Sequence, residues 1–190
     1  ELDDCLPTCV LPTCDDQIQD GDETDVDCGG SCGACAMCEG CTVDADCSTG
    51  FCNADDACSF QQRMEVDAET NCWSTTDFAN NVVIQDLPAG TYRTTAAASG
   101  WTGFPPPWSP PDSGWTWYVE CIDVEFTQMI TPEGAKYANA ATAFANLISE
   151  TDSFDWPGGD FSCGRFDTVC SDNSGSVIFD LEFVCPADGM

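Results

Sequence analysis

Sixteen cysteines in a chain of 190 residues restrict its possible folds more than any other feature of the sequence. Eleven of them fall within residues 1–58, a stretch with almost no apolar periodicity, so disulfides rather than an apolar core must order it. Cytosolic reductants would keep such a framework open, and it therefore needs an oxidising compartment. The cysteines predict a secreted, extracellular protein with a disulfide-rich module at residues 1–58.

Four of these cysteines, Cys32, Cys35, Cys38 and Cys41, follow one another at a strict three-residue spacing. Similar spacings occur in iron–sulfur ferredoxins and in redox C-x-x-C motifs. The ferredoxin run ends in three residues and a proline, and this chain lacks that ending. Because seven other cysteines share the module, we favour structural disulfides and keep a metal or redox site as the alternative.

The cysteines divide unevenly between the module and the rest of the chain. Eleven precede Ser59 and five follow it, an odd number in each part. Odd counts require a bridge between the parts, such as Cys58 to Cys72, a bridge between chains, or a free thiol in each part. Residues 1–14 also contain the run L-P-T-C-V-L-P-T-C, which is too rich in proline to fold locally. We expect copies of the chain to meet head to tail, with residues 1–14 of one contacting the second domain of the next, and so to form a filament.

The charge is strongly acidic, with 34 acidic residues against four basic ones and no histidine. A formal charge of -30 argues against nucleic acid and anionic membranes as partners. Carboxylates repel one another unless a cation bridges or screens them, which favours calcium as a ligand. Without histidine the usual Ser-His-Asp and Cys-His arrangements are excluded, so we predict that the protein is not an enzyme. A glycosidase working through two carboxylates is the remaining catalytic alternative.

Strand-like patterns begin at Ser59, where the cysteines thin out. The predicted strands lie at residues 82–84, 91–98, 115–126, 153–156, 164–169 and 176–185. We expect a hairpin between the first two and a bulge near Cys121, where the apolar pattern changes phase. A helix is predicted to start at Thr131, with Pro132 and Glu133 in its first turn. Its apolar stripe consists of Tyr137, Ala141, Phe144 and Ile148.

These patterns place a second domain at residues 59–190, behind the module of residues 1–58. The predicted fold class is mainly β: an antiparallel, jelly-roll-like β-sandwich with one short helix. No apolar run of about eighteen residues is present, so we expect no membrane span.

The most strongly patterned stretch runs from Asp167 to Cys185, where an acidic loop leads into an alternating strand. One face of that strand carries Val177, Phe179, Leu181, Phe183 and Cys185. The loop offers hard oxygen ligands from Asp167, Ser171, Asp172, Asn173 and Ser174. Gly175 permits a sharp turn before the strand. These residues predict a calcium site, with a metal-free polar turn as the alternative.

The run D-N-S-G-S-V-I-F-D-L resembles the last loop and strand of the PA-IL-like, galactophilic lectins, a family of jelly-roll sandwiches that bind sugar through calcium. The stretch from Trp101 to Phe104 resembles an early loop of that family. The resemblance implies calcium ligands at Asp167, Asp172, Asn173 and the Phe104 carbonyl, with Thr168 or Ser171 replacing the family's threonine. Stacking on a sugar ring is a possible role for Trp101, Trp108 and Trp115, with packing inside the domain as the alternative.

Residues 14–58 resemble cysteine-rich modules of secreted bacterial and algal proteins. Within them several acids surround Gly21 in the run D-G-D-E-T-D-V-D, which resembles a calcium loop without the full EF-hand ligand order. The candidate ligands are Asp20, Asp22, Asp25 and Asp27, with Asp16 beside them. A solvated acidic turn between disulfides is the alternative.

Taken together, the sequence predicts a secreted, non-catalytic structural or adhesive protein. We expect it to be a subunit of an extracellular fibre, coat or matrix, stabilised by disulfides and calcium, with further copies of itself as its partner. Thr8 and Thr13 are candidates for O-linked sugar. The alternative is a calcium-dependent, carbohydrate-binding lectin, for which glycans would be the partner.

Overall fold

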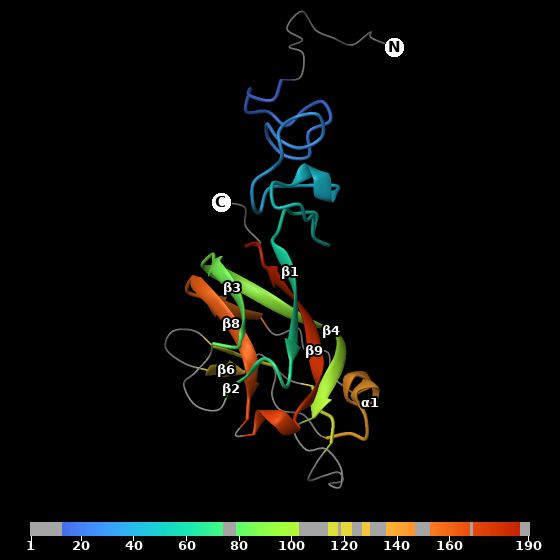
Figure 1. Ribbon diagram of the computed structural model, residues 1–190. Coiled ribbons are helices and arrows are strands. Elements are labelled where there is room, and N and C mark those ends of the chain that lie inside the picture. The colour runs from blue at the N-terminus through green and yellow to red at the C-terminus, as the bar shows by residue number, and fades with distance from the viewer. Residues whose placement is uncertain are drawn as a thin grey trace, which may run out of the picture. The chain divides into compact units, whose positions relative to one another are not determined.

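The computed structural model describes residues 13–73, 79–102, 114–117, 119–122, 127–129, 136–146, 153–167 and 169–186. The chain divides into two compact units, and the first combines residues 1–60 with residues 185–190. The second unit is Gln61–Val184, so the chain passes from one unit to the other twice. The predicted fold class is confirmed, because the strands form two mainly antiparallel sheets accompanied by one short helix (Figure 1).

The first unit has cysteine side chains where most domains have apolar ones. Its described part contains one short 3-10 turn, η1 (Asp44–Asp46), and a few isolated bridges. Its buried cluster consists of Cys28, Cys35, Cys41, Cys47 and Cys58, with Cys52 packed against it. Aliphatic side chains take no part in this cluster: Ile18 is 59% exposed and Val43 is 56% exposed. Cystine sulfur therefore fills the interior of this unit.

The disulfides of the first unit explain both the four evenly spaced cysteines and the odd cysteine counts. The pairs are Cys14–Cys32, Cys28–Cys35, Cys41–Cys52, Cys47–Cys58 and Cys38–Cys185. The four evenly spaced cysteines thus go to four different partners, which confirms structural disulfides. Cys38–Cys185 joins the two parts with odd counts within one chain. The suggested pair Cys58 to Cys72 is wrong, because these cysteines bond to Cys47 and Cys170.

The first sheet of the second unit confirms the alternating face predicted for the last strand from Val177 to Leu181, whereas Phe183 is half-buried and Cys185 lies beyond the end of the strand. Its order is β1 (Gln61–Asp67), β9 (Ser174–Phe183), β4 (Gly90–Thr102) and β7 (Ser153–Trp156), all antiparallel. Val177, Phe179 and Leu181 are fully buried. The neighbouring strand β1 adds Met64 opposite Phe179 and Val66 opposite Val177. Burying these paired apolar side chains is the main favourable term for this sheet.

The second sheet is arranged around β8 (Gly159–Phe166). It also contains β2 (Cys72–Trp73), β3 (Val82–Leu87), β5 (Glu120–Ile122) and β6 (Thr127–Met129). Only β2 runs parallel to β8. The predicted hairpin is wrong, because β3 pairs with β8 while β4 belongs to the other sheet. The turn between β3 and β4 therefore carries the chain from one sheet to the other. Two disulfides of this unit involve this sheet: Cys72 of β2 bonds to Cys170, and Cys121 of β5 bonds to Cys163 of β8.

Aromatic side chains fill one end of the second unit. Tyr92 meets the Phe183 ring edge-on at a centroid distance of 5.3 Å, and Phe161 meets Trp156 in the same way at 5.1 Å. The Tyr92 hydroxyl donates to the Pro88 carbonyl oxygen at 2.9 Å, and burial raises the pKa of Tyr92 to about 12. These rings contribute a large buried area with defined edge-to-face geometry.

Two further sequence predictions need correction. The predicted helix start at Thr131, Pro132 and Glu133 lies outside the described residues, and the described helix α1 (Ala140–Ala145) begins after Asn139, which caps it by accepting a hydrogen bond from the Thr142 amide at 2.9 Å. Tyr137 instead exchanges two backbone hydrogen bonds with Trp115, each of 2.8 Å. Within the described part of the predicted strand at residues 115–126, only β5 is a regular strand, and Trp117, Val119 and Cys121 are buried.

Strand irregularities occur at places other than the predicted bulge at Cys121. One register shift lies between Ala96 and Ala98, where β4 pairs with β9. Another lies between Ile84 and Leu87, next to Asp86, whose φ is 53°. Residues 123–126, which follow Cys121 closely, lie outside the described residues. None of the helices in the described ranges is long and apolar enough to cross a membrane.

Gly164 in β8 provides a test of this packing. A Cβ atom at this position would collide with the Asn81 side-chain oxygen and lie 2.7 Å from the Asn71 carbonyl oxygen. We expect Gly164→Ala to lower the free energy of unfolding by about 1–3 kcal/mol, as overpacking of a filled site does. Chemical denaturation measures this loss. Gly33→Ala is the control and should change stability little, since a Cβ there meets no atom within 4 Å; equal effects of the two variants would contradict the packing.

Candidate metal sites

The acidic loop predicted to bind calcium in the second unit encloses a buried arginine. Arg165 is 5% exposed, and its Nη2 atom lies 3.3 Å from Asp167 Oδ2. Its Nε atom donates to Asn173 Oδ1 at 3.2 Å. Asn173 is equally buried, and its Nδ2 atom lies 3.5 Å from the Cys72 sulfur. Two of the predicted ligands therefore already contact a cation of the protein itself.

The other predicted ligands of this loop that the structure describes are Ser171, Asp172 and Ser174. Asp172 ends the short turn η2 (Cys170–Asp172), and its buried Oδ1 atom receives no hydrogen bond from the described residues. Ser171 is exposed, and Thr168 and Phe104 lie outside the described residues. Calcium at this loop stays a prediction, and the Arg165 guanidinium supplies positive charge that the sequence reasoning had assigned to the metal.

A signal for Arg165 was present in the sequence. It is one of only four basic residues, and it precedes Asp167 by two positions. Residues two apart on a strand share a face, so an arginine and an aspartate at this spacing predict an ion pair.

Of the three candidate sugar-binding tryptophans, only Trp115 has a described side chain. Trp108 and the side chain of Trp101 lie outside the described residues. Trp115 is half-buried and its backbone pairs with Tyr137. The sugar site therefore stays a prediction.

The acids of the N-terminal loop separate into different structural roles. Asp22 accepts a hydrogen bond from the Ser31 hydroxyl at 2.7 Å, and Asp25 accepts one from the Gly40 amide at 2.6 Å. The hydroxyl bond holds the pKa of Asp22 below its usual value. The predicted set of four ligands is thus divided, and Asp22 and Asp25 each have a structural partner of their own.

Asp20 and Asp27 belong to one network of hydrogen bonds with Asp16 and Glu23, although no three of these four carboxylates place oxygens within 4.8 Å of one another. The Asp27 carboxylate accepts from the amide of Asp16 at 2.8 Å, and Glu23 Oε2 accepts from the amides of Asp20 and Asp27 at 3.1 and 3.3 Å. We call Asp16, Asp20, Glu23 and Asp27 the acid group. Its backbone bonds hold four carboxylates within one short loop.

Asp20 is the member of the acid group with an unfilled position. Its Oδ1 atom is buried and receives no hydrogen bond from the described residues. Burial raises the pKa of Asp20, and the charges of Asp16, Glu23 and Asp27 raise it further. A calcium ion would reverse both effects, because it prefers several carboxylate oxygens as ligands.

Asp46 shows most clearly what acids do in the first unit. Its Oδ2 atom accepts from the Thr42 amide and hydroxyl, both at 2.9 Å, and from the Val43 amide at 3.1 Å. Its Oδ1 atom accepts from the Gly30 amide at 3.2 Å. The Thr42 amide is the main reason that the pKa of Asp46 lies below its usual value. Carboxylates here order the backbone in a unit that has few strands or helices to do so, a role that the sequence reasoning missed.

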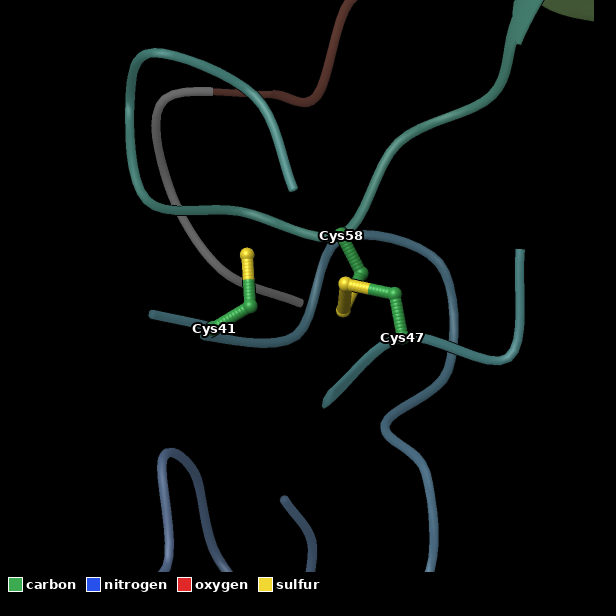
Figure 2. Close-up of side chains that lie close together, drawn as sticks. All are labelled: Cys41, Cys47 and Cys58. Atoms are coloured by element: carbon green, nitrogen blue, oxygen red, sulfur yellow. A yellow bond between two sulfur atoms is a disulfide. The ribbon is translucent and has the colours of Figure 1, made fainter. Parts of the chain in front are cut away.

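Cysteine sulfurs also gather closely in this unit, as Figure 2 shows for Cys41, Cys47 and Cys58. Metals bind the deprotonated thiol of cysteine. All three cysteines belong to disulfides, so they offer no such ligand. The same holds for the cysteines of the other two close groups, which also contain Glu23 or Glu39.

No protein-family model, no curated protein and no solved structure matches this chain. The likeness to PA-IL-like lectins and to cysteine-rich modules therefore stays a resemblance of short motifs.

Proposed function

We propose that this chain is a secreted, non-catalytic structural protein that serves as a subunit of an extracellular fibre, coat or matrix. The observation that carries the proposal is the interior of the first unit, whose buried cluster consists of disulfide-bonded cysteines. Such an interior holds its shape only under oxidising conditions. Disulfides also stabilise a fold by restricting its unfolded state, which suits a protein that must persist outside the cell.

Calcium is the proposed counter-ion of the first unit. Residues 1–60 contain no lysine and no arginine, so their carboxylates have no cation of their own. In the second unit, by contrast, Arg63, Arg93 and Arg165 each pair with an acid. We expect the ion at the acid group, bound to the Asp20 oxygen that receives no hydrogen bond from the described residues.

The variant Asp20→Asn tests this calcium site. Because the pKa of Asp20 is raised in the folded state, its ionised form destabilises the fold at neutral pH, and the penalty disappears as the pH falls below that pKa. We expect the metal-free variant to melt at a higher temperature than the metal-free wild type. Calcium should stabilise the wild type by binding its native state, and should stabilise the variant much less.

Differential scanning calorimetry with and without millimolar calcium measures both effects. Asp56→Asn is a matched control, because it removes one exposed charge from the same unit and asparagine tolerates the positive φ of 57°. The control should keep the full calcium response. An unchanged melting temperature of the wild type on adding calcium would remove the calcium proposal.

Assembly is the second part of the proposal, and it rests on the N-terminal segment. The odd cysteine counts no longer support it, because Cys38–Cys185 satisfies them within one chain. Besides Cys14, which bonds to Cys32, residues 1–14 contain two further cysteines, Cys5 and Cys9, and two prolines, a composition too rich in proline to predict a regular element. We propose that this segment contacts the second unit of the next copy, in a head-to-tail contact that extends into a filament.

Deleting residues 1–13 tests the assembly. In sedimentation velocity the oxidised full-length chain should form larger species as its concentration rises, and the truncated chain should remain a monomer. Glycan binding and hydrolysis of reporter glycosides are measured on the same samples, since either activity would favour the lectin or the glycosidase instead. Equal behaviour of both chains in sedimentation would contradict the head-to-tail contact.

A further inference from the structure

The Cys38–Cys185 disulfide closes a covalent loop around the whole second unit. The two cysteines are separated by 147 positions, and Gln61–Val184 lies entirely between them. Both cysteines belong to the first unit. The second unit is therefore inserted between two chain segments that a covalent bond already joins.

The other described disulfides do not change this covalent connection between the two segments. Cys14–Cys32 and Cys28–Cys35 lie wholly before Cys38. The remaining described pairs lie wholly between Cys38 and Cys185, as the sequence positions show: Cys41–Cys52, Cys47–Cys58, Cys72–Cys170 and Cys121–Cys163. A pull on the two ends of the chain thus passes through Cys38–Cys185, and no part of residues 39–184 lies on the covalent path that carries it.

The second unit has a weak point where tension would otherwise enter. Its first strand β1 and its last strand β9 are antiparallel neighbours, and Gln61 pairs with Glu182. Tension between Phe60 and Cys185 would therefore pull on adjacent ends of one ladder, which runs from this pair to Asp67 and Ser176. Hydrogen bonds in such a ladder are perpendicular to the strands, so they would break one pair after another rather than together.

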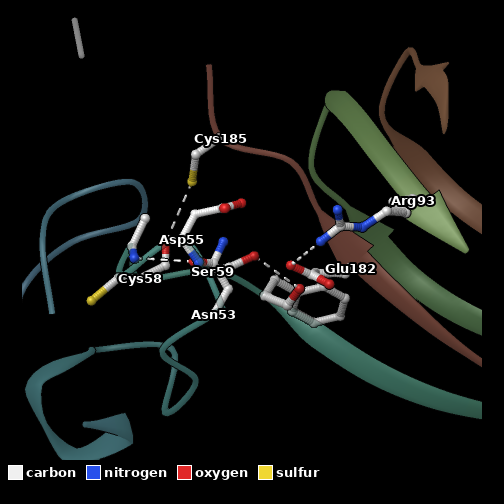
Figure 3. A network of polar contacts seen from close by, with 9 residues as sticks. Asn53, Asp55, Cys58, Ser59, Arg93, Glu182 and Cys185 are labelled. Carbon is white, nitrogen blue, oxygen red and sulfur yellow. Dashed lines mark hydrogen bonds and ion pairs between the residues drawn. The ribbon is translucent and has the colours of Figure 1, made fainter. Parts of the chain in front are cut away.

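The Cys38–Cys185 bridge lies against the backbone of the first unit. Cys185 Sγ lies 3.6 Å from the Cys58 carbonyl oxygen, as Figure 3 shows. Within the second unit, the same figure shows the 3.0 Å ion pair between Arg93 and Glu182 at the end of β9. Cys38 and Cys185 are both half-buried, whereas Cys35, Cys58 and Cys163 are fully buried. A soluble reductant therefore reaches Cys38–Cys185 more readily than the fully buried bridges.

We propose that Cys38–Cys185 is a tension bypass: while it is oxidised, force between the chain ends leaves the second unit folded, and its reduction lets β1 and β9 unzip. This inference goes beyond the proposed structural role: it concerns force applied to the two ends of one chain, and not force that enters through the second unit, where the proposed head-to-tail contact would place a neighbouring copy. The bypass is a property of one chain, so it can fail or hold independently of whether copies assemble.

Single-molecule force spectroscopy on the full chain, with cysteine-free peptide handles at its two ends, tests the bypass. The oxidised wild type should show no extension step from the second unit. The double variant Cys38→Ser, Cys185→Ser should add a low-force step in which residues 58–72 and 170–185 extend, because Cys72–Cys170 still protects what lies between. Its length should be roughly 10 nm, at about 3.5 Å per residue.

Two further measurements keep the result interpretable. If the double variant does not fold, reductant added to the wild type during a constant pull should produce this step, in addition to the shorter extensions released when Cys14–Cys32 and Cys28–Cys35 open. The matched control Cys121→Ser, Cys163→Ser removes a bridge inside the bypassed loop and should leave the oxidised extension unchanged. A step of this size in the oxidised wild type, or its absence after Cys38–Cys185 is removed or reduced, would overturn the proposal.

Discussion

Mild reduction is expected to unfold residues 13–60 while the sheets of Gln61–Val184 keep their strand signal. The first unit loses its entire buried cluster when its disulfides open, because that cluster consists of cysteines. Small disulfide-rich units without an apolar core typically lose about 2–5 kcal/mol for each native bridge removed. The second unit keeps its apolar core, in which Tyr92, Phe161 and Phe179 are fully buried.

Amide NMR spectra recorded during a titration with reductant separate the two responses. Signals from residues 13–60 should lose their dispersion first, while those of β1, β4 and β9 should stay dispersed. The bridge Cys121–Cys163 should open late, since both of its cysteines are buried. Simultaneous loss of both sets of signals would show that the two units are one cooperative structure.

Replacing the single carboxylate of Asp46 should also destabilise the first unit. Asp46→Ala leaves the amides of Gly30, Thr42 and Val43 without their acceptor in the part of the chain that orders η1. Backbone donors that lose their partner away from water are costly. We expect the melting temperature of the first unit to fall by roughly 10 °C, which is a large effect for a unit of this size.

The control for this substitution is Asp55→Ala, which removes an exposed acid two residues after Asn53. It should change the melting temperature little, as most exposed substitutions do. Acidification should reproduce the effect of Asp46→Ala. The pKa of Asp46 is lowered by folding, so its stabilisation is present above its ordinary pKa near 4 and is lost as the pH falls through the lower, folded-state value. A first unit that melts at the same temperature in both variants would refute the role of Asp46.

Local patterns in the sequence were enough to predict parts of this structure. The density of cysteines before Ser59 predicted a unit held together by disulfides, and the alternation from Val177 to Leu181 predicted the buried face of β9. Both inferences depend only on neighbours in the sequence or on composition. The short strand β7 was predicted with its observed bounds for the same reason.

Features that depend on distant partners could not be predicted in this way. Cys38 has the same local surroundings as Cys35 and Cys41, and nothing nearby in the sequence marks Cys185 as its partner. The sheet that receives β3 is likewise decided by β8, far along the chain. The roles of the acids could not be predicted for another reason. In the sequence, a carboxylate that binds backbone amides cannot be told from one that binds a metal. The amide donors around Asp46 in the structure distinguish the two roles.

The disulfide framework is the central claim of this account, because the interior of the first unit, the proposed extracellular location and the proposed tension bypass all depend on it. Peptide mass spectrometry after non-reducing digestion of the unreduced protein tests it directly. The account predicts a linked pair of peptides that contain Cys38 and Cys185, together with Cys41–Cys52, Cys47–Cys58 and Cys72–Cys170, all from single chains. Free thiols at these positions, or Cys38 linked to a cysteine of another chain, would contradict it.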